Sequence, residues 1–183
     1  MKPFETLSRE VLGDYRIFRL RKDRCRSPRT KAEHDFFVLE ADSWVNVVAL
    51  TPDDHIILID QYRFGVEQIT LEMPGGIIEP GEDPAGAATR ELLEETGYAP
   101  ETVSVLGYVE PNPAILNNRC YTVLAQNCRV GGGQTLDDQE DIGVRLFDLA
   151  ELPKLFSNGK IRHALVWAAY LHFELFRRNT PTR

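Results

Sequence analysis

The sequence lacks the features expected of a secreted, membrane-bound or nucleic-acid-binding protein. Its N-terminus, MKPFETLSRE, has no apolar segment of the kind found in secretion signals, and its longest apolar runs, such as residues 165–171, are too short to cross a bilayer. Lys and Arg number 21 against 28 Asp and Glu, so no basic patch dominates. These absences predict a cytoplasmic protein without a membrane or nucleic-acid partner.

Cysteine is scarce as well. The three cysteines, Cys25, Cys120 and Cys128, form neither an even framework nor a C-x-x-C pair, which favours reduced thiols over disulfides or zinc. Strand alternation places Cys120 in a core, which is a better interpretation than a catalytic thiol. His163 and His172 are interpreted as surface or packed residues because no second His or Cys stands at zinc spacing.

What is present is an ordinary globular composition. The chain has 183 residues, of which 43% are hydrophobic and 27% charged, enough for a substantial core in a domain of common size. It shows no internal repeat, low-complexity tract or linker.

The most informative stretch is residues 76–98, GIIEPGEDPAGAATRELLEETGY. Asp83 suits a helix N-cap, Pro84 suits the first helical turn, and Gly97 can adopt the left-handed conformation that ends a helix. The signals predict a helix over Pro84 to Thr96.

This helix concentrates carboxylates on one face. Glu91, Glu94 and Glu95 are three or four residues apart, and Arg90 is the only base among them. Glu94 and Glu95 also lie in the last turn, where the helix dipole disfavours acids. The pattern favours a hard divalent cation, most simply Mg²⁺, over a solvated acidic face.

At this spacing the stretch resembles the Nudix box, G-x5-E-x7-R-E-U-x-E-E-x-G-U. Only the final apolar position departs from it, where Tyr98 replaces the usual aliphatic residue. The matching residues are Gly76, Glu82, Arg90, Glu91, Leu92, Glu94, Glu95 and Gly97.

Flanking segments resemble the ADP-ribose pyrophosphatase branch of that superfamily. Gln61-Tyr62-Arg63 precedes the box, Glu72 lies in an E-x-P-G-G segment, and Pro113 follows Gly97 by sixteen residues. The resemblance implies that Arg63 contacts phosphate or base, with an exposed arginine as the alternative, and that Glu72 binds substrate or bridges to Arg63. Pro113 is also implied at the substrate. The segment PNPAILNNR looks closer to bacterial nucleoside-diphosphate-sugar hydrolases, which leaves substrate preference open.

A glycine-rich, acidic segment follows, RVGGGQTLDDQEDIGV. Glycines give a loop the freedom of a lid, and its acids could reach a metal site on closure. The ADP-ribose pyrophosphatase branch supplies a further glutamate from the loop after the box. The resemblance implies that Glu140 is the best match to this glutamate and that Asp138 is the second-best match. The alternative is a flexible acidic surface loop.

The resemblance also implies a cofactor, Mg²⁺ or alternatively Mn²⁺. Its implied ligands are the carboxylates of the box together with the Gly75 carbonyl and the later glutamate. Bound metal would neutralise a pyrophosphate and lower the pKa of a water. The number of ions is left open. The implied set is Gly75, Glu91, Glu94, Glu95 and Glu140.

Catalytic roles follow from the same resemblance. Glu140 would position or deprotonate the attacking water, with Asp138 or a box glutamate such as Glu95 as the alternative base. Arg90 would orient the glutamates through its pair with Glu94 rather than touch substrate.

The rest of the chain completes the fold prediction. An N-terminal hairpin turning at Gly13-Asp14 leads into a basic connection over residues 21–35, either solvated or receiving an anionic substrate. Further strands are expected at 35–40, 44–50, 55–61, 102–108 and 121–126, and a loop at 64–70. Helices are expected at 148–156 and 162–178, followed by a frayed end at 179–183. The second helix has apolar positions at helical spacing, namely Leu165, Ala168, Ala169, His172 and Leu175.

This pattern fits an α/β protein with the Nudix α/β/α sandwich, a mixed β-sheet and an N-terminal β-hairpin extension. Residues 1–43 are expected to form dimerisation strands, and residues 44–183 the hydrolase domain. Resemblance implies a homodimer.

The implied function is hydrolysis of the pyrophosphate bond of nucleoside diphosphate sugars, of the ADP-ribose, ADP-glucose or GDP-mannose type, to a nucleoside monophosphate and a sugar phosphate. Two alternatives stay open. One is a house-cleaning nucleoside triphosphate pyrophosphatase. The other is a non-catalytic nucleotide sensor.

Overall fold

The computed structural model describes residues 1–180 of the chain. They form two compact units, one made of Met1–Ser43 and Glu110–Arg119 and the other of Trp44–Val109 and the chain from Cys120 onward. Among the described residues, no helix has the length and apolar character needed to cross a membrane.

The first unit contains an antiparallel sheet of β1 (Glu5–Asp14), β2 (Arg19–Arg26) and β3 (Glu33–Glu40). The predicted hairpin is present, but its turn lies at residues 15–18. Gly13 and Asp14 instead pair with Leu20 and Arg19 inside the ladder. The residues 110–119 join this unit through the N–H of Leu39, which donates to the Ile115 carbonyl at 2.7 Å.

The predicted basic connection over residues 21–35 is shorter than expected: only residues 27–32 connect strands, whereas 21–26 belong to β2 and 33–35 to β3. Their charges alternate with acids on neighbouring strands, and opposite charges across a ladder stabilise a sheet. The ion pairs join Lys22 to Glu10, Arg24 to Glu33 and Asp35, Arg26 to Glu5 and Glu33, and Arg21 to Asp23 and Glu40.

The second unit contains a mixed sheet in the order β11, β5, β4, β9, β8. Strand β6 pairs with residues 59–63 of β5. Among the described strands of this sheet, β4 and β9 are the one parallel pair. A short ladder of β7 (Tyr98–Ala99) and β10 (Arg129–Val130) lies apart from it. The strands are β4 (Trp44–Leu50), β5 (His55–Arg63), β6 (Gln68–Glu72), β8 (Thr102–Val109), β9 (Cys120–Gln126) and β11 (Ile142–Asp148).

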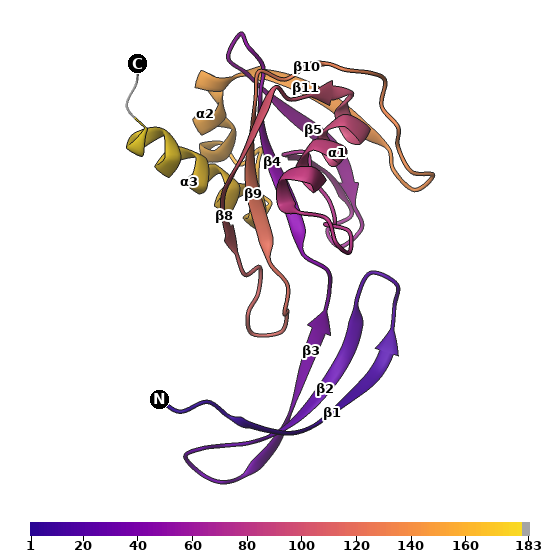
Figure 1. Cartoon of the computed structure of the whole chain (residues 1–183), viewed down its shortest axis with the longest axis vertical. Coiled ribbons are helices and arrows are strands. Elements are labelled where there is room, and N and C mark those ends of the chain that lie inside the picture. The colour runs from indigo at the N-terminus through magenta and orange to yellow at the C-terminus, as the bar shows by residue number, and fades with distance from the viewer. Residues whose placement is uncertain (181–183) are drawn as a thin grey trace. The chain divides into compact units, whose positions relative to one another are not determined.

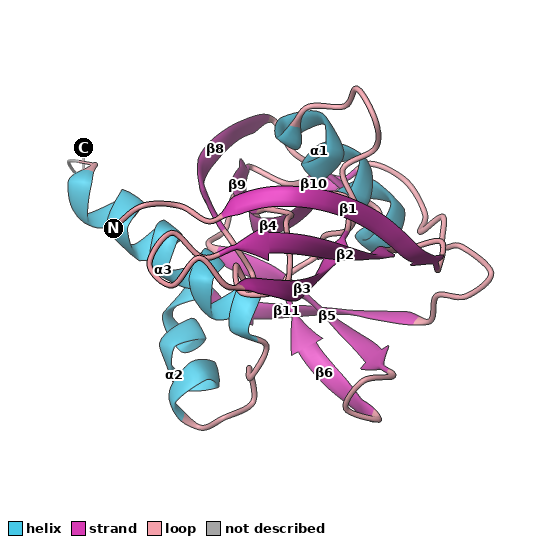
Figure 2. Cartoon of the chain, turned by 90° about the horizontal axis from the view of Figure 1, so that it is seen from below, coloured by secondary structure: helices cyan, strands magenta, loops and turns pink. Residues whose placement is uncertain are grey.

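Helices cover both faces of this sheet (Figures 1 and 2). Helix α1 (Pro84–Thr96) packs on one face. There, its buried residues form a hydrophobic cluster with every second residue of β4; the members are Ala87, Ala88 and Leu92 with Val45, Val47 and Ala49. Helices α2 (Leu152–Ser157) and α3 (Ala164–Asn179) pack on the other, around Ile56 and Leu58. The predicted α/β/α sandwich on a mixed sheet is confirmed.

Helix α1 has the predicted limits. Asp83 accepts a hydrogen bond from the Gly86 N–H at 2.8 Å, which caps the first turn. Gly97 has φ of 75° and its N–H donates to the Leu93 carbonyl, which ends the helix.

Two C-terminal predictions needed correction. Residues 148–156 form a 3-10 turn, η1 (Leu149–Glu151), capped by Asp148, and then α2. On α3 the buried residues are Val166, Ala169 and Phe173, so Ala169 is the one predicted apolar position of this helix that is buried. Of the predicted frayed end, α3 includes Asn179, and residues 181–183 lie outside the described residues. Strands β6 and β11 were not predicted.

Candidate functional site

The site forms where the sheet divides. Strands β4 and β5 pair through only two residue pairs, and beyond them the segment 74–77 lies along β4. The N–H of Val45 donates to the Gly76 carbonyl at 2.9 Å, and the N–H of Val47 donates to the Pro74 carbonyl at 2.8 Å. This inserted segment brings Gly75 and Gly76 beside helix α1.

Two glycines make close approaches, Gly75 to backbone and Gly76 to the Glu91 side chain. A Cβ at position 75 would lie 2.0 Å from the Val45 carbonyl oxygen, and a Cβ at position 76 would lie 2.5 Å from the Glu91 carboxylate. The Gly75 N–H also donates to Glu95 Oε2 at 2.8 Å. The glycine pair therefore lets two box carboxylates touch the backbone.

These two carboxylates are poorly compensated. Burial raises the pKa of Glu95 to about 8, against the opposing Gly75 hydrogen bond, and the charges of Glu91 and Glu140 add to the rise. Burial also raises the pKa of Glu91, although Arg90 opposes it. The site holds excess negative charge where a cation would be stabilised.

Arg90 organises the box. It makes two hydrogen bonds to Glu82, at 3.0 and 3.1 Å, and single ones to Glu91, Glu94 and the Ile77 carbonyl. Hydrogen bonding to Glu82, followed by the other two glutamates, raises its pKa. The expected pair with Glu94 is formed, and Arg90 also joins the loop to the helix.

Arg63 and Glu72 form a second ion pair. Arg63 Nε and Nη2 donate to Glu72 at 2.9 and 2.8 Å, and the Thr70 hydroxyl donates to the same carboxylate at 2.5 Å. Burial favours a higher pKa for Glu72, but these hydrogen bonds outweigh it and leave the pKa lowered. Of the two predicted roles of Glu72, the bridge to Arg63 is present. Hydrogen bonding to Glu72 likewise raises the pKa of Arg63, to which the charges of Glu95 and Glu140 contribute.

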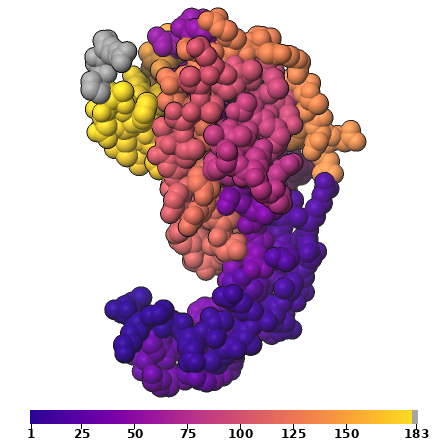
Figure 3. Space-filling view, viewed as in Figure 1, coloured from indigo at the N-terminus to yellow at the C-terminus, as the bar shows by residue number. Residues whose placement is uncertain are grey.

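The glycine-rich segment is anchored to the end of α1, which Figure 3 shows as neighbouring magenta and orange surfaces. The N–H groups of Gly131 and Gly132 donate to the Gly97 carbonyl at 2.9 and 3.1 Å, and the Thr135 N–H donates to the Glu94 carbonyl at 2.9 Å. Gln134 Nε2 donates to the Glu95 carbonyl at 2.6 Å. These donors satisfy the last carbonyls of the helix, so residues 131–135 are not a free lid. Sequence analysis missed Gln134.

Glu140 lies beyond this anchor. Its carboxylate accepts a hydrogen bond from the Asp137 N–H at 3.0 Å, and its charge reaches Arg63, Glu91 and Glu95. Among the described residues, Asp138 makes no comparable contact. Glu94 is more exposed than Glu91, at 41% against 13% of the side chain. Pro113 belongs to the first unit.

A divalent cation fits the donors at this site. The oxygens of Glu91 and Glu95 lie against two glycines that leave no room for a Cβ, and both carboxyl groups have raised pKa values. Carboxylate and carbonyl oxygens suit a hard cation. Within residues 1–180, however, no three His, Cys, Asp or Glu side chains are arranged as a ready metal cluster. Arg90 binds the carboxylates of Glu91 and Glu94, two of the predicted ligands, so metal binding requires side-chain adjustment.

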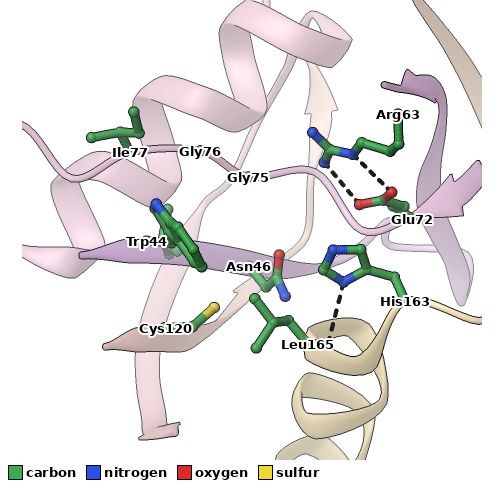
Figure 4. A pocket seen from close by; sticks show the side chains of 11 residues that line it. Trp44, Asn46, Arg63, Glu72, Gly75, Gly76, Ile77, Cys120, His163 and Leu165 are labelled. Carbon is green, nitrogen blue, oxygen red and sulfur yellow. Dashed lines mark hydrogen bonds and ion pairs between the residues drawn. The ribbon is translucent and has the colours of Figure 1, made fainter. Parts of the chain in front are cut away.

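A cavity of about 290 Å³ opens beside Gly75 and Gly76, on the face of β4 that α3 covers (Figure 4). We call it the Asn46 cavity. Its further lining residues are Trp44, Val45, Asn46, Arg63, Glu72, Ile77, Cys120, His163 and Leu165.

Sequence analysis missed most of these residues. His163 caps α3, since its Nδ1 accepts the Leu165 N–H at 3.2 Å, and it also faces the cavity. The only available signal for Asn46 was a polar residue in the otherwise apolar strand WVNVVAL. Cys120 is buried as predicted, and burial raises the pKa of its thiol to about 12, so it carries no thiolate near neutral pH.

Comparison with known proteins agrees with this geometry. A family model described as the NUDIX domain matches residues 42–167. An ADP-ribose pyrophosphatase of Bacillus subtilis is 28% identical over 178 residues, covering 96% of this chain and 96% of the relative. One from Mycobacterium tuberculosis is 30% identical over 174 residues, covering 92% and 82%. A crystal structure of an ADP compounds hydrolase matches the fold with a TM-score of 0.86 at 23% identity, covering 97% and 96%.

Family and relatives together indicate a hydrolase acting on pyrophosphate bonds. The chain belongs to the NUDIX family, and its resemblance to the ADP-ribose pyrophosphatase branch is confirmed.

Proposed function

We propose that this protein hydrolyses the pyrophosphate bond of ADP-ribose and related nucleoside diphosphate sugars, giving a nucleoside monophosphate and a sugar phosphate. The observation that carries the proposal is the placement of the Arg63–Glu72 pair and the carboxylates of Glu91 and Glu95 around one glycine segment. A cationic guanidinium beside a carboxylate-rich metal position suits a pyrophosphate. The curated ADP-ribose pyrophosphatases support this choice.

Mg²⁺, or alternatively Mn²⁺, is the proposed cofactor, with Gly75, Glu91, Glu94, Glu95 and Glu140 as its ligands. When bound, it would supply charge neutralisation at the phosphates and a lowered pKa for a coordinated water.

The chain's own residues bind and orient the substrate. Arg63 is held by buried Glu72 in a fixed orientation, with 40% of its side chain exposed, and would donate to a phosphate oxygen. Arg90 would position the glutamates, because it contacts three of them. Pro113 stays a proposed substrate contact.

We assign the proton transfer to a carboxylate. Water oxygen attacks one phosphorus, the bond from that phosphorus to the bridging oxygen breaks, and the water's proton passes to the carboxylate. Glu140 is the proposed base because it best matches the glutamate that the ADP-ribose pyrophosphatase branch supplies after the box, and its charge contributes to the raised pKa of Glu95. Asp138 and Glu95 are the alternative bases. Single substitutions, Asn at position 138 or Gln at positions 95 and 140, would distinguish the three candidates.

The test is a substrate panel with Mg²⁺ or Mn²⁺. ADP-ribose, ADP-glucose, GDP-mannose and nucleoside triphosphates would be compared by kcat/KM and by product identity. We expect ADP-ribose to exceed the triphosphates, with no free phosphate released. Faster triphosphate hydrolysis to pyrophosphate would favour the house-cleaning function. Binding without turnover would favour a sensor.

We also propose a cytoplasmic homodimer in which residues 1–43 pack against the partner and shape its substrate pocket. Three free, buried thiols suit a reducing compartment. The sheet of the first unit carries large exposed apolar side chains, including Phe36 and Phe37 on β3 at 44% and 53% exposure. Apolar side chains of this size gain stability when a partner covers them.

A further inference from the structure

A second cavity adjoins Arg63 but not the glycines of the box. Its volume of about 440 Å³ is within the range of roughly 300–1,000 Å³ that is usual for small-molecule pockets. Arg63 and His163 line both this cavity and the Asn46 cavity, so the two are neighbours. We call it the Arg162 cavity. Its other lining residues are Gly65, Val66, Gln68, Thr70 and Arg162.

Strand β6 holds two arginines at this cavity. Successive side chains of a strand point to opposite faces, so Gln68, Thr70 and Glu72 share one face. At one end of this row, Glu72 binds Arg63 through two hydrogen bonds. At the other end, Gln68 Oε1 accepts a hydrogen bond from Arg162 Nη2 at 2.5 Å. The row therefore fixes two guanidinium groups beside the same cavity.

The two guanidinium groups differ in their partners. Arg63 is paired with the buried carboxylate of Glu72, whereas Arg162 is bonded to a neutral amide and, within residues 1–180, forms no ion pair. The described residues that line the cavity include no Asp or Glu, although acids outnumber bases in the chain by 28 to 21. A fixed cation without a countercharge in a cavity attracts an anion.

The remaining lining supplies a further donor and an apolar surface. His163 Nδ1 accepts the Leu165 N–H at 3.2 Å, so Nε2 carries the proton in the neutral ring. The turn residues Gly65 and Val66 contribute the apolar surface. Bases commonly stack on aromatic side chains, but the described lining includes no Trp, Tyr or Phe. A sugar that carries an oxyanion therefore matches this lining better than a base does.

We propose that the Arg162 cavity binds the sugar arm of the substrate and that Arg162 selects sugars that carry a phosphate group. The inference rests on the proposed function, in which Arg63 donates to an oxygen of the pyrophosphate. Because Arg63 also lines the Arg162 cavity, a sugar joined to that pyrophosphate can enter it. Arg162 uses one of its guanidinium N–H donors for Gln68, so others are left for the oxygens of the sugar's phosphate.

The first test compares ADP-ribose with ADP-ribose phosphorylated at C1 of the terminal ribose. We expect the wild type to have a kcat/KM at least about 10-fold higher for the phosphorylated substrate, because hydrogen bonds to a charged group contribute that much. In Arg162→Gln this ratio should fall to about 1, which completes a double-mutant cycle. Arg178→Gln, which removes an exposed positive charge near the other end of α3, is the matched control and should keep the ratio. A wild-type ratio near 1, or an unchanged ratio in Arg162→Gln, would overturn the assignment.

The second test does not depend on turnover. Isothermal titration calorimetry in chelator would compare ribose 1,5-bisphosphate with ribose 5-phosphate, neither of which contains a pyrophosphate bond. The wild type should bind the bisphosphate at least about 10-fold more tightly, and Arg162→Gln should bind the two ligands alike. Equal affinities in the wild type would contradict a phosphate site in the cavity.

The two proposals fail differently. If the wild type hydrolyses neither substrate but the bisphosphate keeps its Arg162-dependent preference in calorimetry, the proposed function falls and the cavity assignment stands. If ADP-ribose is hydrolysed and the sugar phosphate changes neither kcat/KM nor affinity, only the cavity assignment falls. Should Arg162→Gln not fold, Gln68→Leu takes its place, because it removes the acceptor that holds Arg162 and should lower the same two ratios. Unchanged ratios in that variant would overturn the assignment.

Discussion

Glu95 is the residue at which the proposed metal binding conflicts most directly with the stability of the folded state. Its side chain is 2% exposed, and it receives a backbone hydrogen bond but no cationic partner. Burial raises its pKa to about 8, whereas an unfolded glutamate titrates near about 4.3. Without metal, ionising Glu95 therefore destabilises the folded state.

This gives a pH prediction for the protein in chelator. The folded state binds the Glu95 proton more tightly, so its stabilising effect is complete below the unfolded pKa and is lost as pH rises through about 8. Urea unfolding should show a free energy of unfolding that falls between pH 5 and 8.5. Glu95→Gln should remove most of this slope, keep or raise the melting temperature, and reduce turnover with saturating Mg²⁺ at least 100-fold. Exposed Glu101→Gln is the control. A Glu95→Gln enzyme with near wild-type turnover would refute its role as a ligand.

Arg63 is predicted to matter for geometry as well as charge. Arg63→Lys keeps the charge but loses the two-point contact with Glu72, so we expect kcat/KM to fall at least 10-fold with little change in stability. Arg63→Ala leaves the buried Glu72 carboxylate without its cationic partner, although the Thr70 hydroxyl still donates to it. Its cost should be about 2 kcal/mol, below the roughly 3–5 kcal/mol of fully buried pairs, because Arg63 is 40% exposed.

Adding Glu72→Gln to Arg63→Ala provides the check. The double variant should recover stability in denaturant unfolding but not activity, because the unpaired charge is gone and the phosphate contact is still missing. Full activity in Arg63→Lys would show that the fixed guanidinium is unnecessary.

At the scale of elements, the junction between α1 and residues 131–135 holds the box in place. Gly97 occupies the left-handed region with φ of 75°, and a Cβ there would lie 2.7 Å from the Gly132 carbonyl oxygen. The backbone hydrogen bonds from Gly131 and Gly132 depend on this close approach.

Alanine substitution at two glycines tests the junction. Gly97→Ala should lower the free energy of unfolding by about 1–3 kcal/mol, because it combines backbone strain with a contact to main chain. Gly132→Ala is the matched control, since a Cβ there meets nothing within 4 Å, and should change stability by less than about 0.5 kcal/mol. Equal effects in thermal and denaturant unfolding would contradict the proposed junction.

Element prediction succeeded where its signals were local. The limits of α1 follow from Asp83, Pro84 and Gly97, which act within one helix. Most of β2 and the first residues of β3 were misread because their many charges resemble a loop, and only the cross-strand pairs explain them. The box residues were identified from their spacing, but tertiary packing alone brings Asn46 and His163 to one cavity and Gln134 to the end of α1.

At the scale of the whole molecule, the proposed dimer makes the first unit part of the active enzyme. Light scattering at micromolar concentration should give twice the chain mass. Phe36→Ser with Phe37→Ser should shift the protein to monomers and lower kcat/KM, because these exposed side chains lose their apolar contact area. Leu171→Ser on α3, 58% exposed, is the control. A stable wild-type monomer with full activity would rule out the dimer.

In the proposed reaction, water attacks phosphorus and splits the pyrophosphate bridge. The carboxylates and Arg63 converge on one position, and the described residues provide no paired arrangement for a covalent nucleophile. The most direct measurement is hydrolysis of ADP-ribose in ¹⁸O-labelled water with Mg²⁺, followed by mass spectrometry of the products. The account predicts AMP and ribose 5-phosphate with one ¹⁸O atom in the phosphate of only one of them, which identifies the phosphorus attacked. Release of free ribose, free adenine or inorganic phosphate as the primary product would contradict it.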